Sequence, residues 1–445
     1  MFKNKKIFVL GMARSGFEVS KLLSKENEVF VTDMKDQKDE DKEVLASLGV
    51  KFSVLDNPEE YLDSTYDLLV KNPGIKYTHP CVVRARELNI PVINEVEVAY
   101  HYLDESVKII GITGSNGKTT TTTLTYEILK AAYPERTHLA GNIGIPLSAM
   151  VSSIKPNDIL VAEISDHQLC DMYNFKTNIS IVTNISECHI DFHDSYARYK
   201  AMKKRIFNNL TNNDLAIINL DNKEAVSISE GINVPTVYFS KDQDTKCFYR
   251  DGKIYYDNEE VVDTKNFLVS GMHNVENAMA AIIATKTLGV DNETIQNVLY
   301  NFKGVEHRFE FVDNIIGRRV YNDSKSTNCE STKIALASFT EPTVILLGGL
   351  DRGHSFDELV PFMTHVKHIV CYGETKERIK EFANTNNFEC TVVDDLVTAT
   401  KTAYEVSSEG DVILLSPACA SWDQFAKFED RGDLFKNTIK GLGEN

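Results

Sequence analysis

The sequence predicts an α/β protein of three domains, each built around a largely parallel β-sheet. Two observations support this class: apolar strands alternate with helical stretches, and two strands end in a glycine turn that a helix follows. A chain of 445 residues also suggests about three domains. We expect these domains at 1–97, 98–303 and 304–445.

Composition excludes several classes of protein. Hydrophobic residues make up 42% of the chain and charged residues 25%, as in ordinary globular proteins. A net charge of −17 disfavours nucleic-acid partners and anionic membranes. The eight cysteines form no Cys-x-x-Cys pair, which is typical of reduced thiols, and no apolar run approaches the length of a bilayer span. We therefore expect a soluble, cytoplasmic protein.

The first strand, turn and helix resemble a nucleotide-binding unit. Strand 7–10 runs into the glycine turn 11–16, and the next strand ends at Asp33. This pattern predicts a Rossmann-like amino-terminal domain. Ala13 replaces the glycine that lets a pyrophosphate approach, so a UDP-sugar is favoured over NAD. Turn 71–75 follows another strand, at the sheet edge where α/β proteins bind ligands.

The clearest motif is the glycine loop at 114–119, which lies between an apolar strand and a helix. Glycines let backbone N–H groups turn inward, Lys118 adds a positive charge, and Thr119 offers a hydroxyl to Mg²⁺. Ile112 stands where the strict P-loop pattern has a glycine, so only the second part of that pattern is present. The loop predicts a central P-loop-type ATPase domain with a parallel sheet.

Polar residues at two strand ends suggest a metal site. Glu163 ends an apolar strand, where it can reach the Mg²⁺ of a nucleotide. His189, Asp191 and His193 follow the next strand and could also form a zinc site. We favour His189 alone as a magnesium ligand, because the other ligands in reach are oxygens.

Three later segments carry other signals. The basic run 199–205 is typical of a solvated helix face. Segments 322–328 and 416–425 are strand-to-helix junctions of a second Rossmann-like unit, where ligands could bind. Cys419 has no sequence-linked histidine, so a packing role is favoured over a nucleophilic one. The pair Asp251-Gly252 predicts a hairpin.

Together these motifs resemble the Mur ligase family, ATP-dependent amide-forming enzymes of peptidoglycan precursor synthesis. The resemblance spans nearly the whole chain and rests on segments 114–120, 141–144, 271–278, 307–308, 322–328, 416–425 and 428–432. The last three look like the members that add D-glutamate. The implied substrates are UDP-MurNAc-L-alanine and D-glutamate, joined through an acyl phosphate by a monomeric enzyme.

The resemblance also assigns residues to ATP and metal. It implies ATP contacts from Gly114, Ser115, Asn116, Gly117, Lys118, Thr119, Thr120, Asn274, Asn277, Arg308 and Asp323. It implies two Mg²⁺ ions held by Thr119, Glu163, His189 and Lys203, with Lys203 carbamylated by CO₂ rather than part of a solvated face. The implied catalytic groups are Lys118, Glu163, His189, Lys203 and Lys325.

Substrate contacts follow by the same resemblance. The UDP part is expected at Arg14, Ser15, Asp33, Met34, Asn72 and Gly74, and Asn142 is expected near the phosphoryl group. The D-glutamate pocket is expected at Thr327, Arg352, Ser421 and Phe428.

Two positions depart from the family pattern. Asp166-His167-Gln168 stands where the family commonly reads Ser-Phe-Gln, which adds a carboxylate and an imidazole beside the metal site. Arg352 stands where some members have lysine, which keeps the charge and changes the hydrogen-bond geometry.

Three alternatives remain. A folylpolyglutamate synthetase-like ligase would share the ATP loop, but the first domain and segment 416–432 disfavour it. A dehydrogenase would use turn 11–16 for NAD, which Ala13 and the separate ATP loop disfavour. An ATP-switched binding protein would hydrolyse ATP slowly, without dependence on an amino acid.

Overall fold

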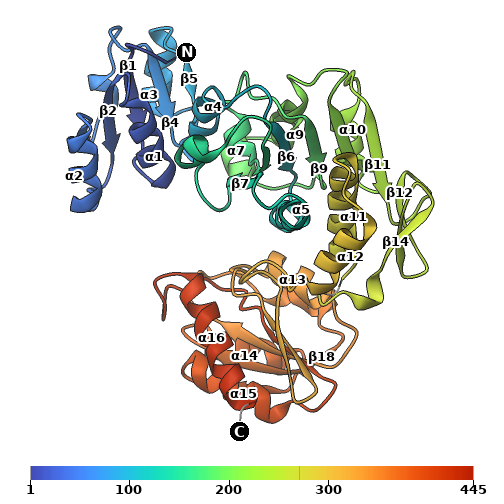
Figure 1. Ribbon diagram of the computed structural model, residues 1–445. Helices are drawn as coiled ribbons and strands as arrows, with labels where there is room; N and C mark the ends of the chain where they lie inside the picture. Colours follow the sequence, from blue (N-terminus) through green and yellow to red (C-terminus); the bar gives the residue numbers. More distant parts are fainter. Residues whose placement is uncertain (1, 270, 444–445) are drawn as a thin grey trace. The chain divides into compact units, whose positions relative to one another are not determined.

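The computed structural model describes residues 2–269 and 271–443. They divide into two compact units (Figure 1). The first unit holds Met1–Asp263 and Glu276–Val298, and the second holds Thr264–Val275 and Leu299–Asn445. The first unit contains two separate sheets, and the domain boundaries inferred from the sequence stay predictions.

The amino-terminal sheet of the first unit has five parallel strands in the order β3-β2-β1-β4-β5. Its strands are β1 (Lys6–Leu10), β2 (Glu28–Asp33), β3 (Lys51–Val54), β4 (Leu68–Lys71) and β5 (Val92–Ile93). The helices are α1 (Arg14–Leu23), α2 (Asp39–Ser47), α3 (Pro80–Glu87) and α4 (Glu95–Tyr100), with a 3₁₀ turn at Pro58–Tyr61.

Apolar residues cover both faces of this sheet, as expected for parallel strands with helices on each side. Ile7 and Val9 pack in one cluster with Leu23 of α1. Phe8, the intervening residue, packs on the opposite face with Val82 of α3. The carboxyl edge of the sheet is therefore fixed from both sides, and the glycine turn 11–16 begins there.

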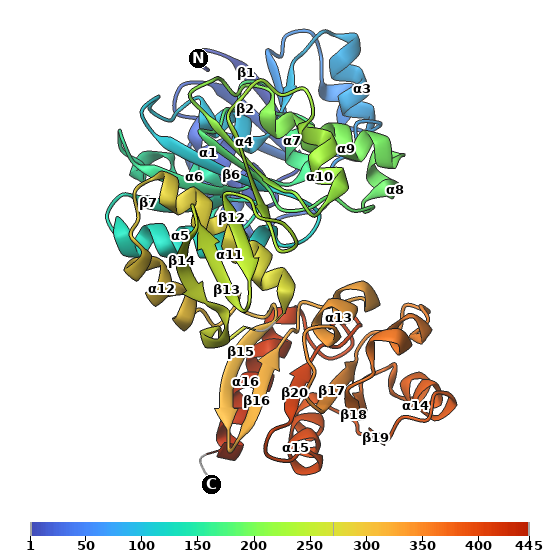
Figure 2. The same ribbon diagram turned by 90° about the vertical axis from the view of Figure 1, so that its right-hand side faces the viewer.

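The second sheet of the first unit has nine strands in the order β14-β13-β12-β11-β10-β9-β6-β8-β7. The strands are β6 (Lys108–Thr113), β7 (Thr137–Gly141), β8 (Ile159–Glu163), β9 (Ile179–Val182), β10 (Leu215–Asn219), β11 (Thr236–Ser240), β12 (Cys247–Arg250), β13 (Lys253–Tyr256) and β14 (Glu259–Asp263). The run from β7 to β12 is parallel, and β12, β13 and β14 are antiparallel (Figure 2). The hairpin at Asp251-Gly252 is confirmed, with both residues at positive φ.

The helices that accompany this sheet are mostly short. They are α5 (Lys118–Ala132), α6 (Leu147–Met150), α7 (Asp166–Leu169), α8 (Ile190–His193), α9 (Tyr196–Lys204), α10 (Lys223–Ser229), α11 (Met272–Thr287) and α12 (Asn292–Asn301), with 3₁₀ turns at Val151–Ser153 and Arg205–Phe207. The start of α11, the end of α12 and the 3₁₀ turn at Thr264–Asn266 belong to the second unit. Tyr199 of α9 and Ile228 of α10 pack in one core cluster with strand residues such as Ile109 and Leu160.

The second unit contains a six-stranded sheet in the order β15-β16-β20-β17-β18-β19, parallel except for the edge strand β15. Its strands are β15 (Glu310–Ile315), β16 (Arg318–Asn322), β17 (Thr343–Gly348), β18 (Val366–Tyr372), β19 (Cys390–Val392) and β20 (Val412–Leu415). The helices are α13 (Cys329–Leu336), α14 (Lys376–Thr385), α15 (Leu396–Val406) and α16 (Phe428–Gly443), with a 3₁₀ segment at Asp357–Phe362. Leu347 packs with α13 and α14, and its neighbour Leu346 packs with α15 and α16.

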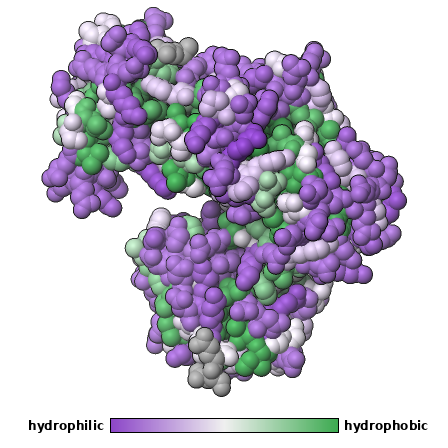
Figure 3. Space-filling model, in the orientation of Figure 1, coloured by the Kyte–Doolittle hydropathy of each residue, from purple (hydrophilic) through white to green (hydrophobic). Residues whose placement is uncertain are grey.

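Surface and thiol properties agree with the composition. Hydrophilic residues cover most of the face drawn in Figure 3. Within the described residues, no helix has the length and apolar character needed to cross a bilayer. All eight cysteines are free, and Cys371 and Cys390 lie 3.4 Å apart at sulfur without a disulfide.

Candidate active site

The glycine loop connects β6 to α5, as the sequence predicts. Gly114 and Gly117 have positive φ values of 147° and 79°, and a Cβ atom at Gly117 would lie 2.3 Å from Asn277 Oδ1. Only glycine fits such a conformation and such a close approach. Lys118 Nζ donates to the carbonyls of Gly114 and Ser115, each at 2.8 Å. Its charge is therefore held over the loop.

The end of β9 fixes the loop from one side. Ser115 N donates to Asn184 O at 2.8 Å, and Asn116 N donates to Asn184 Oδ1 at 2.9 Å. Thr183 Oγ1 donates to Asn116 O at 2.6 Å. On the other side, Thr121 Oγ1 donates to Asn277 Oδ1 of α11 at 3.1 Å. These contacts preorganise the loop before any anion binds.

Glu163 lies at the end of β8 with 1% of its surface exposed. Its Oε1 accepts a hydrogen bond from Asn142 Nδ2 at 2.8 Å, but its Oε2 is buried without a partner among the described residues. A buried carboxylate oxygen without a donor is costly unless a cation satisfies it. Glu163 therefore fits a divalent cation. Thr119, in the first turn of α5, offers a hydroxyl that fits the same chemistry.

Lys203 of α9 is completely buried. Its Nζ donates to Thr113 Oγ1 at 3.1 Å and to Gly114 O at 2.9 Å, and it lies 3.3 Å from Asp166 Oδ1. The interpretation of the basic run as a solvated face is thus wrong for Lys203, because the helix turns this residue toward the core. It holds for Lys204, which is exposed.

Asp166 is the centre of a group of cations and imidazoles. Its Oδ2 lies 3.0 Å from His189 Nδ1, 2.7 Å from His193 Nε2 and 3.3 Å from His167 Nδ1. Its side chain is 2% exposed. Asp191, which the sequence offered as a zinc ligand, does not belong to the cluster of possible metal ligands that the described residues form here.

The pKa values of this group follow from burial and charge. Burial alone would raise the pKa of Asp166, but hydrogen bonds from His189 and His193 and the charge of Lys203 hold it well below its usual range. Burial lowers the pKa of Lys203 to about 8, the charge of Lys118 adds to this effect, and Asp166 opposes it. Burial likewise lowers the pKa of His167 to about 4.

Two adjoining pockets extend along the first unit. One, of about 580 Å³, is lined by Gly11, Asp33, Met34, Asn72 and Gly74 among others. The second, of about 440 Å³, shares Ala13, Asn72 and Gly74 with the first and also contains Arg14, Ser15, Asn142, Ser165 and His167. The structure thus brings together the residues expected to contact the UDP moiety and Asn142, and the second pocket reaches the Asp166 cluster.

Local contacts shape these pockets. Met12 N donates to Asp33 Oδ2 at 2.7 Å, which ties the glycine turn to the end of β2. Arg14 Nη1 donates to Gly144 O at 2.9 Å, so it bridges the turn after β1 and the turn after β7. Asp33 therefore already accepts a backbone hydrogen bond from the glycine turn.

In the second unit, Asp323 follows β16 directly and is buried. Ser326 Oγ donates to its carboxylate at 2.5 Å, Ser416 Oγ at 2.8 Å and Phe309 N at 3.1 Å. Burial nonetheless raises the pKa of Asp323 to about 6, against these hydrogen bonds and the charge of Arg308. The segments 322–328 and 416–421 meet through this carboxylate.

Other expected residues belong to the same unit. Lys325 Nζ lies 5.8 Å from the centre of the Phe428 ring, and Arg352 lies 4.9 Å from the Trp422 ring, which is 64% exposed. Ser421 is buried, Thr327 and Arg308 are half-buried, and Asn274 is buried in the first turn of α11. The first unit thus holds the loop, Glu163, His189, Lys203, Asn277 and the pocket residues, and the second holds the remaining candidates.

Arg431 is a site-shaping residue that sequence reasoning gave no role. It is fully buried, and its guanidinium donates to Ser324 Oγ at 2.9 Å, Ser324 O at 2.7 Å and Cys419 O at 3.0 Å. It therefore joins α16 to both strand-end segments. Burial raises the pKa of the neighbouring Cys419 thiol to about 11, which agrees with a packing role.

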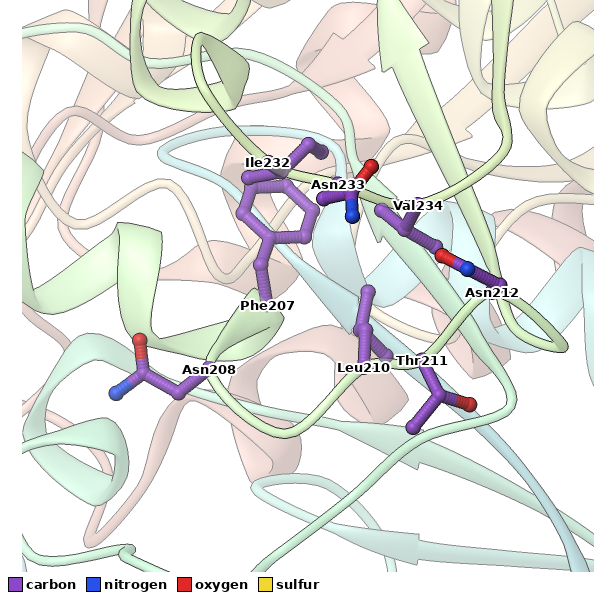
Figure 4. Close-up of a pocket in the computed structure, with 8 residues that line it drawn as sticks. All are labelled: Phe207, Asn208, Leu210, Thr211, Asn212, Ile232, Asn233 and Val234. Carbon is purple, nitrogen blue, oxygen red and sulfur yellow. The ribbon is translucent and has the colours of Figure 1, made fainter.

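A further pocket of about 420 Å³ lies away from these groups (Figure 4). Its lining residues are Phe207, Asn208, Leu210, Thr211, Asn212, Ile232, Asn233 and Val234. Phe207 and Ile232 lie side by side in Figure 4, and Asn208 points away from them. None of the lining residues is ionisable, so their side chains offer no general acid or base.

Comparisons with known proteins agree with this geometry. The Mur ligase middle domain matches residues 112–285, and the Mur ligase, glutamate ligase domain matches residues 307–419. Three proteins described as UDP-N-acetylmuramoylalanine–D-glutamate ligases are similar over their whole length. The protein of Geobacillus kaustophilus is 42% identical over 99% of this chain and 98% of its own length. That of Enterococcus hirae is 43% identical over 99% of this chain and 97% of its own length. That of Streptococcus pneumoniae is 44% identical over 100% of this chain and 99% of its own length.

Solved structures show the same fold. The UDP-N-acetylmuramate-alanine ligase of Thermotoga maritima matches with a TM-score of 0.61 and 20% identity, covering 99% of this chain and 100% of its own. The MurF ligase of Thermotoga maritima in complex with ADP matches with a TM-score of 0.57 and 15% identity, covering 99% and 96%. The predicted α/β class is confirmed, and the chain belongs to the Mur ligase family.

Proposed function

We propose that this protein is an ATP-dependent ligase that adds D-glutamate to UDP-MurNAc-L-alanine in the synthesis of peptidoglycan precursors. The observation that carries the proposal is identity of 42% to 44% over almost the whole chain with ligases of that name. The glycine loop, the unsatisfied oxygen of Glu163 and the two adjoining pockets supply the chemistry that this reaction needs. We place the reaction in the cytoplasm and expect a monomer.

ATP is proposed to bind with its phosphates on the glycine loop. Residues 114–120 supply backbone N–H groups, and Lys118 supplies the charge that stabilises the transferring phosphoryl group. Asn277 supports the loop through Thr121 and is proposed to face the nucleotide. The contacts assigned to Asn274, Arg308, Asp323 and Lys325 remain predictions.

Two Mg²⁺ ions are proposed to be held by Thr119, Glu163, His189 and Lys203. When bound, these ions would neutralise the negative charge of the phosphates. Lys203 is proposed to become an anionic carbamate by reaction with CO₂. Its pKa of about 8 supports this step, because the neutral amine is the form that attacks CO₂.

The UDP-sugar is proposed to occupy the two adjoining pockets, with Arg14, Ser15, Asp33, Met34, Asn72 and Gly74 at the UDP end. Asn142 then lies where the L-alanine carboxylate would react. This carboxylate attacks the γ-phosphate of ATP and forms an acyl phosphate. The amine of D-glutamate attacks the activated carbonyl, and phosphate leaves. Thr327, Arg352, Ser421 and Phe428 are proposed to select D-glutamate.

The test is phosphate release from ATP and Mg²⁺ with UDP-MurNAc-L-alanine present. D-glutamate is compared with L-glutamate, L-alanine, L-lysine and no amino acid. The expected result is release that requires D-glutamate, with a product heavier by one glutamyl residue. Release with another amino acid would change the proposed substrate, and release indifferent to every acceptor would favour an ATP-switched binding protein.

A matched pair of variants ties this activity to the loop. Lys118→Met should lower kcat at least about 100-fold, because it removes a charge that stabilises the transition state. Lys130→Met changes the same residue type near the other end of α5 and should retain activity. Equal losses in both variants would indicate misfolding of α5 rather than loss of phosphate binding.

A further inference from the structure

Asp166, His167 and His189 form a cluster whose ligand atoms all lie within 4.8 Å of one another. The carboxylate oxygen Oδ2 of Asp166 is the common point, at 3.0 Å from His189 Nδ1 and 3.3 Å from His167 Nδ1. The two imidazole rings have their centres 4.9 Å apart. Two nitrogens and one oxygen therefore converge on one small volume.

The backbone fixes each of these three side chains. Asp166 begins α7, and Ser165 caps that helix in a reciprocal pair of hydrogen bonds with Gln168. His189 has a positive φ of 53° at the start of α8, which is an uncommon conformation for a residue other than glycine. His167 follows Asp166 directly on α7. A ligand set held by backbone turns needs little reorganisation to receive an ion.

Lys203 and His193 also contact the Asp166 side chain without belonging to this three-residue cluster. Lys203 approaches the other oxygen, Oδ1, at 3.3 Å. His193 Nε2 lies 2.7 Å from Oδ2 and is completely buried, so it can orient the carboxylate from the core side. The side chains of His167 and His189 are 23% and 49% exposed, which gives an ion a path from solvent.

A second cluster in the described residues shows the contrast. Glu306, His307 and Asp433 also bring three ligand atoms together. Lys436 Nζ lies 2.7 Å from Glu306 and 3.3 Å from Asp433, so an ammonium group already neutralises both exposed carboxylates. Among the described residues, Asp166 pairs with the ammonium group of Lys203 only through Oδ1, and its Oδ2 faces imidazole nitrogens.

We propose that Asp166, His167 and His189 form a binding site for a divalent transition-metal ion of the Mn²⁺, Co²⁺ or Zn²⁺ class. Two imidazoles with one carboxylate suit these ions, whereas Mg²⁺ prefers oxygen ligands. This site shares His189 with the proposed Mg²⁺ ligands, adds Asp166 and His167 as ligands, and does not include Glu163. The link between this site and amide formation rests on the proposed function, because His189 is shared.

The test is a titration of the full-length, nucleotide-free protein with Co²⁺, followed by visible absorption. The expected result is d–d absorption that saturates at one ion per chain, is displaced by Zn²⁺ or Mn²⁺, and is not displaced by an equal concentration of Mg²⁺. Asp166→Asn and His167→Phe should each weaken Co²⁺ binding at least about tenfold. Asp158→Asn is the matched control, because Asp158 also pairs with an imidazole, His138, at 2.8 Å in the same unit.

Absence of d–d absorption in the wild-type protein would overturn the proposal, as would equal Co²⁺ affinity in the wild type and in His167→Phe. The latter variant keeps the test valid if Asp166→Asn fails to fold. Phosphate release dependent on D-glutamate is measured in parallel with Mg²⁺. Ligase activity without Co²⁺ binding refutes only the metal site, and Co²⁺ binding without ligase activity refutes only the proposed reaction.

Discussion

Asp166 and Asp323 are both buried aspartates near the carboxyl end of a parallel strand, but their surroundings differ in charge. Asp166 lies beside the ammonium group of Lys203 and three imidazoles. Asp323 accepts hydrogen bonds from two serine hydroxyls and one backbone N–H. The pKa of Asp166 is well below its usual range, and the pKa of Asp323 is raised to about 6.

At Asp323, neutral hydrogen bonds alone do not compensate the buried carboxylate for its lost hydration. Asp323 has three donors and still keeps its proton up to about pH 6, whereas Asp166 has a neighbouring positive charge and stays ionised. The first unit therefore holds a permanent anion beside its glycine loop. The second unit holds a carboxyl group that changes charge near neutral pH.

The largest effect is expected from Lys203→Met, which removes the ammonium group and leaves the Asp166 carboxylate buried. The free energy of unfolding should fall by about 3 kcal/mol, because an uncompensated buried charge is costly. Urea unfolding followed by circular dichroism measures the loss. Lys204→Met, at the exposed neighbour, should change stability by less than about 0.5 kcal/mol. Similar losses in both variants would mean that Asp166 does not depend on Lys203.

A smaller effect, with opposite sign, is expected from Asp323→Asn. The folded-state pKa is raised, so the stability that protonation of Asp323 provides is present at low pH and is lost as pH rises through about 6. At about pH 8 the variant should be more stable than the wild type by up to about 2 kcal/mol, and this gain should disappear below about pH 4. Unfolding curves at several pH values measure it, and a gain independent of pH would contradict the assignment.

Asp166→Asn should change stability relative to the wild type in the direction opposite to Asp323→Asn. Its folded-state pKa is depressed, so the stability it provides is present above the ordinary carboxyl pKa and is lost only as pH falls below that value. The variant should therefore be less stable than the wild type throughout about pH 5 to 8. The two variants should change the free energy of unfolding in opposite directions at about pH 8, so the comparison is tested by the sign of the change and not by its size.

Ser416→Ala tests what a neutral donor contributes. It removes the hydroxyl that donates to Asp323 at 2.8 Å, and the expected loss of stability is about 1 kcal/mol at about pH 8. The pKa of Asp323 should rise further, because one group that stabilises the carboxylate is gone. Carbon-13 NMR of labelled aspartate measures this pKa, and a fall in its value would refute the role of the hydroxyl.

The smallest effect concerns carbamylation of Lys203. Asp166 raises the pKa of Lys203, so Asp166→Asn should lower that pKa below about 8 and increase the fraction of neutral amine. With ¹³C-labelled bicarbonate at about pH 7.5, the carbamate signal should increase by no more than about fourfold, which corresponds to less than about 1 kcal/mol. An absent signal in both proteins would contradict carbamylation.

Local sequence patterns were sufficient to predict strands of the sheets and the glycine loop. Strands 7–10 and 412–415 are short apolar runs followed by turns, and the glycines at 114 and 117 predict the conformation that the structure shows. The edge strand β15 was not predicted, because residues 310–315 mix apolar and charged residues without a clear period of two. Its pairing with β16 depends on the turn at 316–317.

The centre of the site could be predicted only in part. Asp166, His189 and Lys203 come from three separate segments, and no local pattern states that they meet. The spacing of Tyr199 and Lys203 by one helical turn was a usable signal, since both are completely buried on the same face of α9. Arg431 gave no comparable signal, because its partners lie on segments that only the folded sheet brings together.

The self-contacts of Lys118 bear on which anions the loop accepts. The ammonium group already satisfies two carbonyl oxygens, at Gly114 and Ser115. An arriving phosphate must draw it away, and water must then solvate those oxygens, so binding is an exchange of partners. A triphosphate carries several negative charges and chloride only one, so a triphosphate gains more from the ammonium group in this exchange. If ATP binds as proposed, the self-contacts of Lys118 would therefore favour highly charged anions over chloride.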